Sequence, residues 1–109
     1  MYQIVHYYWN SNEPANRIMV FDLMTYIRGA LYTFDDYFTD VAEPDGSLEA
    51  NGDYARWLNK TAAIYKDIKK RIDFARRANL DTILYTHSSN SLMVNLEITI
   101  IDSEPECEF

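Results

Sequence analysis

The sequence predicts a small two-layer α+β domain, in which two amphipathic helices cover a three-stranded, mainly antiparallel sheet. Apolar residues alternate with period two near both ends of the chain and recur every three or four residues through its middle. Turn-forming residues separate these segments, which gives the order β-α-α-β-β. Because 109 residues suit one core, we assign 1–101 to a single domain and 102–109, with four acids and a proline, to an acidic C-terminal tail.

The first element expected is a strand over residues 2–9, which are rich in aromatic and β-branched side chains. Strand alternation places the odd-numbered residues from Val5 to Trp9 on one face and the even-numbered residues from Ile4 to Tyr8 on the other. Both faces are largely apolar. This pattern predicts a central strand.

A long helix is predicted over residues 16–42, where apolar side chains form one continuous stripe. Pro14 suits a first helical turn, where a missing N–H costs nothing, and the run Glu43 to Gly46 is a stop signal. The stripe consists of Val20, Leu23, Met24, Ile27, Ala30, Leu31, Phe34, Phe38 and Val41.

A second helix is predicted from Asp53, a suitable N-cap residue, to Asn79, a residue that often ends helices. A hairpin then follows, with strands at 82–87 and 92–101 around the turn residues 88–91. In its second strand every even-numbered residue is apolar, which predicts one face in the core.

Composition indicates a folded, acidic, soluble protein, with 48% hydrophobic residues and a formal net charge of -7. Cys107 is the single cysteine, so no intramolecular disulfide can form. The N-terminal residues lack a basic region, and no apolar run approaches a membrane span. We therefore expect no membrane association and a cytoplasmic location, in the host cytoplasm if the protein is viral.

The charges are segregated along the chain: residues 1–53 carry -7, residues 54–80 carry +6 and residues 81–109 carry -6. The densest acidic run, here called the acidic ridge, consists of Asp35, Asp36, Asp40, Glu43, Asp45, Glu49 and Asp53. Two interpretations are open. The basic second helix can neutralise the ridge within the fold, or the ridge can face a cationic partner.

The leading functional hypothesis is a non-enzymatic binding protein whose acidic ridge, with the adjacent Tyr32, blocks a basic surface on a partner protein. In composition the chain resembles small acidic inhibitors, including viral anti-defence proteins and toxin-neutralising immunity proteins. The resemblance implies a nucleic-acid-processing or defence enzyme, or a toxin, as partner. Direct nucleic-acid binding is disfavoured because a net charge of -7 opposes counterion release.

An alternative hypothesis is a structural or assembly subunit that self-associates, for example as a homodimer, through a sheet edge or the second helix. Phe74 falls outside the apolar stripe of that helix and projects among cations, with Lys70 and Arg77 as its partners in a possible interface.

The sequence gives no catalytic, metal or cofactor signature. His6 and His87 lie on predicted strands that can be neighbours, but two imidazoles without further ligands do not make a zinc site. Cys107 lies among acids, which raise a thiol pKa and suppress its reactive form. We therefore expect no enzymatic activity, no metal and no cofactor.

Overall fold

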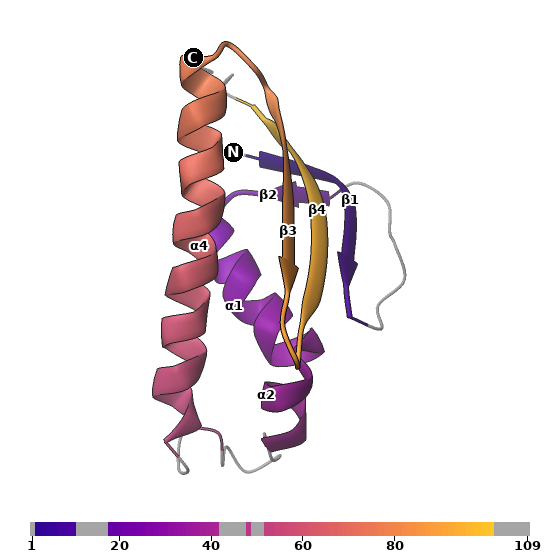
Figure 1. The fold of residues 1–109 in the computed structure, drawn as a ribbon, viewed down its shortest axis with the longest axis vertical. Coiled ribbons are helices and arrows are strands. Elements are labelled where there is room, and N and C mark those ends of the chain that lie inside the picture. The colour runs from indigo at the N-terminus through magenta and orange to yellow at the C-terminus, as the bar shows by residue number, and fades with distance from the viewer. Residues whose placement is uncertain (1, 11–17, 42–47, 49–51, 102–109) are drawn as a thin grey trace.

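The sheet has four strands in the order β2-β1-β4-β3, and each neighbouring pair is antiparallel (Figure 1). The computed structural model describes residues 2–10, 18–41, 48 and 52–101. The strands are β1 (Tyr2–Trp9), β2 (Ile18–Val20), β3 (Thr82–Ser88) and β4 (Met93–Ile100), and the helices are α1 (Leu23–Phe34), α2 (Asp36–Val41) and α4 (Asp53–Arg77). The α+β class and the antiparallel sheet are confirmed. The predicted strand count is wrong, because β2 adds a fourth strand.

The long helix predicted over 16–42 is also wrong, since its described part is a strand followed by two helices. Ile18–Val20 pairs with Tyr2–Ile4. Asp22 then caps α1, because its carboxylate accepts hydrogen bonds from both the N–H and the hydroxyl of Thr25. An apolar stripe does not reveal such caps. Pro14 and the predicted stop at 43–46 lie outside the described residues.

Asp35 separates α1 from α2. Its backbone is extended, with φ -74° and ψ 120°, and its carboxylate accepts the backbone N–H of Tyr37 at 2.9 Å. A short acidic side chain that hydrogen-bonds a nearby N–H offers the backbone an alternative to helix. The helix therefore breaks here although the apolar spacing continues.

The prediction of β1 as a central strand is confirmed, but its assignment of faces is wrong. Ile4 and Trp9 belong to opposite faces in strict alternation, yet both are fully buried. The register against β4 shifts between Ile4 and His6, as in a β-bulge. One extra residue reverses the alternation, so the two halves of β1 bury residues of opposite parity.

The predicted second helix and hairpin are confirmed, with small shifts at their ends. Gly52, in a left-handed conformation with φ 79°, precedes α4, so Asp53 is its first residue rather than its cap. Asn79 has φ 61° and Leu80 N–H returns to the carbonyl of Ala75, which forms a Schellman-type end. The hairpin turn spans Ser89–Leu92, closed by a 2.8 Å hydrogen bond.

The core lies between one face of the sheet and helices α1 and α4, with the opposite sheet face uncovered by described helices (Figure 1). Along β4, Val94, Leu96, Ile98 and Ile100 are at most 7% exposed, as the alternation predicted. They meet Ile27 and Leu31 of α1 and Ile64, Ile68 and Ile72 of α4 in one cluster. Burial of these apolar side chains is the main favourable contribution to folding.

Asn10 ties three parts of the fold together. Its side-chain amide donates to the carbonyls of Phe34 and Ser91, each at 2.7 Å, and its side-chain oxygen accepts the N–H of Met93. Its backbone N–H donates to the carbonyl of Met93 at 2.8 Å. The end of β1, the end of α1 and the β3–β4 turn therefore meet at one residue, whose φ is 48°.

Candidate functional site

The structure turns the first residue of the acidic ridge inward. Asp35 is 0% exposed, and its carboxylate contacts the Lys60 ammonium of α4 at 2.5 Å. The same ammonium also donates a hydrogen bond to the Ser91 hydroxyl oxygen at 3.3 Å. A buried charge requires such a partner. The ion pair therefore joins α4 to the α1–α2 junction and is part of the fold.

The last residue of the ridge is also neutralised within the fold. Asp53 is 7% exposed, and its carboxylate accepts the Tyr37 hydroxyl at 2.8 Å. Arg56 donates to that hydroxyl and lies 3.5 Å from the carboxylate. At both ends of the ridge the basic helix thus takes up the acidic charge.

Two ridge carboxylates remain at the surface of the described chain. Asp36 and Asp40 are exposed on α2, whereas Glu43, Asp45 and Glu49 lie outside the described residues. Tyr32 is 46% exposed, and its ring packs on Trp57 with the centroids 6.0 Å apart. A partner therefore has access to Asp36, Asp40 and Tyr32, but not to the carboxylate of Asp35.

The two histidines lie on strands that are not neighbours, because β4 runs between β1 and β3. The expectation that adjacent strands bring His6 and His87 together is wrong for this sheet order. Burial, with the nearby Lys60 ammonium, lowers the pKa of His87. Within the described part of the chain, no three His, Cys, Asp or Glu side chains are grouped as metal ligands.

The outer edge of β3 is the most distinctive surface of the described chain. Ser89 N–H bonds to the Leu92 carbonyl and Ile100 N–H bonds to the Asp81 carbonyl, so odd-numbered residues of β3 face β4. The N–H and carbonyl groups of the even-numbered residues therefore point away from the sheet. These residues are Thr82, Leu84, Thr86 and Ser88. No hydrogen bond between described residues takes up their backbone groups.

This edge lacks the features that usually protect edge strands. Strand β3 contains no lysine, acid, proline or glycine, and its register against β4 is regular over seven residues. At the opposite edge, β2 is only three residues long and β1 carries the register shift. Short strands and bulges discourage edge-to-edge pairing. As far as the described residues show, the β3 edge is therefore open to another strand, and the opposite edge is much less so.

An apolar hollow of about 340 Å³ lies beside this edge, between β3 and the last turns of α4. Phe74, Leu80 and Leu84 line it and are 61%, 55% and 66% exposed. Phe74 and Leu80 are large apolar side chains exposed on the α4 side of the hollow, which is typical of an interaction surface, whereas alternation along β3 places the Leu84 side chain on the opposite face of the sheet. Phe74 thus lies at a surface, as its helical position predicted, with the exposed Lys70 and Arg77 on the same helix.

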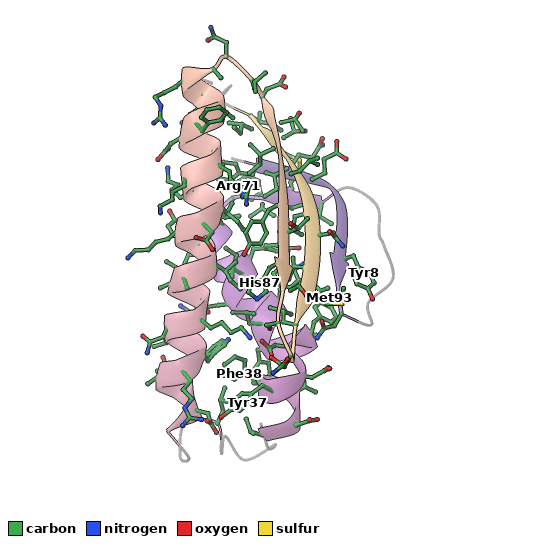
Figure 2. All side chains as sticks on the ribbon, viewed as in Figure 1. Tyr8, Tyr37, Phe38, Arg71, His87 and Met93 are labelled. Carbon is green, nitrogen blue, oxygen red and sulfur yellow. The ribbon has the colours of Figure 1, made fainter. Side chains whose placement is uncertain are left out.

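The inner side of β3 faces α4, and the Tyr85 side chain lies buried between them. Its ring is 2% exposed and lies 5.6 Å from the Arg71 guanidinium carbon of α4. Burial raises the pKa of Tyr85 to about 12, and the nearby Asp67 carboxylate adds to this effect. Figure 2 shows Arg71 and His87 on the α4 side of β3, and Tyr8 and Met93 across the sheet. Asp67 and Arg71 thus flank the centre of the open strand.

Sequence reasoning recognised β3 as a strand but did not identify its edge as a site. That identification requires the sheet order, which the alternation pattern does not contain. The absence of charge and proline from β3 is the one sequence signal that could have indicated it.

Comparison of the chain with protein-family models, with curated proteins and with solved structures finds no match. None of the described helices combines the length and apolar character required to cross a membrane.

Proposed function

We propose that this chain is a non-enzymatic protein-interaction module that binds a polypeptide strand along the free edge of β3. The unprotected row of backbone groups on Thr82, Leu84, Thr86 and Ser88 carries the proposal. Main-chain hydrogen bonds supply affinity in this mode of binding, and adjacent pockets select side chains. The module contributes a preformed sheet, so only the incoming strand has to become ordered.

The hollow beside the edge supports the proposal. A partner strand laid against β3 passes the exposed rings and branches of Phe74, Leu80 and Leu84. A volume of about 340 Å³ accommodates a large apolar or aromatic side chain. Covering these three residues removes apolar surface from water, which contributes roughly 25 cal/mol per Å² before the costs of ordering. The partner is therefore a strand with an apolar anchor residue.

The test uses a labelled synthetic peptide of residues 81–88 as the strand probe, with binding measured by fluorescence anisotropy. We expect Thr86→Pro to weaken binding at least about tenfold, because proline removes the outward N–H and its ring obstructs the incoming strand. The fold should survive, since Thr86 N–H does not bond to β4.

Asn95→Lys is the matched control, because Asn95 pairs with Thr86 in the sheet and is exposed on the central strand β4. We expect it to bind the peptide as the wild type does. Equal loss in both variants would place binding on the outer sheet face, and unchanged binding by folded Thr86→Pro would exclude the edge.

As a second proposal, the chain is an acidic inhibitor whose described binding surface is limited to the exposed carboxylates of the acidic ridge. This proposal is favoured by the exposure of Asp36 and Asp40, which lie one helical turn apart on α2. If these carboxylates meet a basic partner, Asp36→Lys/Asp40→Lys weakens its binding, most strongly at low salt. The measurement is affinity for a partner captured from the source organism. An affinity unaffected by the charge reversal at every salt concentration would rule out this surface.

A further inference from the structure

We infer that the strand bound at the β3 edge is β3 of a second copy of this chain, so that two molecules form one eight-stranded antiparallel sheet, four strands from each copy. This inference rests on the proposed function, because it names the partner of the same edge. Antiparallel pairing of identical strands is self-complementary and closes after two copies.

One register satisfies the whole edge. Pairing Leu84 with Thr86 of the second copy also pairs Thr82 with Ser88, and the two-fold axis then passes beside Tyr85. All four outward-facing residues of each copy are engaged, which gives about eight hydrogen bonds between the strands. Registers centred on Leu84 or Thr86 leave part of the edge unpaired. The seven-residue strand is thus symmetric about its central residue in its hydrogen-bonding groups.

The charges of α4 fit the same axis. A two-fold axis perpendicular to the sheet keeps both copies of α4 on one face and makes them antiparallel. Arg71 lies over the Tyr85 ring and Asp67 acts on the same hydroxyl, so both side chains lie at the height of the axis. Their midpoint along α4 then lies level with the axis, with one helix on either side of it. Each Asp67 faces Arg71 of the other copy, and two basic helices meet with opposite charges at their centre.

Pairing of the two β3 strands also buries apolar surface that is exposed beside the edge of the single chain. Phe74, Leu80 and Leu84 border the edge and are more than half exposed in the single chain. In the second copy the same three residues border the interface, related to the first set by the two-fold axis. The interface therefore combines hydrogen bonds between the strand backbones, oppositely charged side chains at its centre and buried apolar side chains at its ends. These features together are typical of a specific interface.

Analytical ultracentrifugation and amide exchange measured by NMR test the inference on the full chain, from about 1 µM to about 1 mM. We expect a concentration-dependent dimer, with amide exchange of Leu84 and Thr86 slowing as it forms. The amides of Ile83 and Tyr85 already bond within the sheet and should not change. Thr86→Pro should weaken dimerisation at least about tenfold.

Three further variants keep the test decisive if Thr86→Pro does not fold. Leu84→Lys places a charge on the exposed edge opposite Glu97, and should weaken the dimer while Asn95→Lys does not. Asp67→Arg should weaken it by adding like charge at the axis, and Asp67→Arg/Arg71→Asp should restore it.

The outcomes distinguish failure of this inference alone from failure of the proposed function as well. A monomer at all concentrations that still binds the 81–88 peptide overturns the second copy and retains the strand-binding module. A monomer that binds no peptide overturns both. Protection of Leu84 and Thr86 amides that is independent of concentration shows that another segment of the same chain covers the edge, and also overturns the inference. A dimer unaffected by every edge variant places the contact elsewhere.

Discussion

Lys60→Met is expected to destabilise the protein by about 3 kcal/mol, the largest effect of any single change at a charged residue described here. The substitution keeps most of the side-chain length but removes the ammonium that contacts the fully buried Asp35 carboxylate. The carboxylate then retains the Tyr37 N–H as its described partner. An uncompensated buried charge costs far more than a lost surface ion pair. Urea unfolding followed by circular dichroism measures the change.

Lys66→Met is the matched control, because Lys66 is exposed on the same helix. Its effect should stay within about 0.5 kcal/mol. The double variant Asp35→Asn/Lys60→Met should recover about 1–2 kcal/mol relative to Lys60→Met, since the amide oxygen can still accept from Tyr37 N–H without a charge. If Lys60→Met is no more disruptive than Lys66→Met, the ion pair does not hold α4 to the α1–α2 junction.

The same ion pair shows what the acidic run could and could not predict. Seven acids without an intervening base indicate that something must compensate their charge, either the basic helix or a cationic partner. Asp35 and Asp36 are adjacent and chemically identical, yet one is fully buried and the other exposed. Which of the two meets Lys60 depends on the turn between α1 and α2, and residue type does not encode it.

The elements were predictable where a single periodicity ran between clear turn signals. Strand β4 and helix α4 are such segments, and the buried residues of β4 follow the expected alternation. The segment before them failed because the apolar spacing continues through two breaks, at Asp22 and Asp35, that side-chain hydrogen bonds create. Strand β2 was missed for a related reason: three residues are too few to show a period, and pairing with β1 defines them.

The candidate site was predictable only in part. The helical position of Phe74 indicated an exposed apolar residue, and its 61% exposure agrees with this. The row of free backbone groups beside it depends on sheet order, because the same hairpin placed centrally would have no free edge. The sequence therefore predicted one apolar residue of the hollow, Phe74, but not the free strand edge beside it.

Asn10→Ala is the second large effect expected, a loss of about 4 kcal/mol in the free energy of unfolding. The change removes the side-chain hydrogen bonds to Phe34, Ser91 and Met93, each contributing about 1 kcal/mol. It also places alanine at φ 48°, a left-handed conformation that asparagine tolerates better. Thermal and urea unfolding should both show the loss.

Asn79 offers the matched control, because it is the other described non-glycine residue with positive φ, at 61°, and no hydrogen bond is described for its side chain. Asn79→Ala should cost only the conformational part, about 1 kcal/mol. Asn10→Gly relieves the backbone but not the lost hydrogen bonds, so it should remain destabilising by about 3 kcal/mol. If Asn10→Ala and Asn79→Ala cost the same, the side chain of Asn10 does not join β1, α1 and the hairpin turn. A larger loss at Asn10 that glycine only partly relieves would assign that joining role to its amide group.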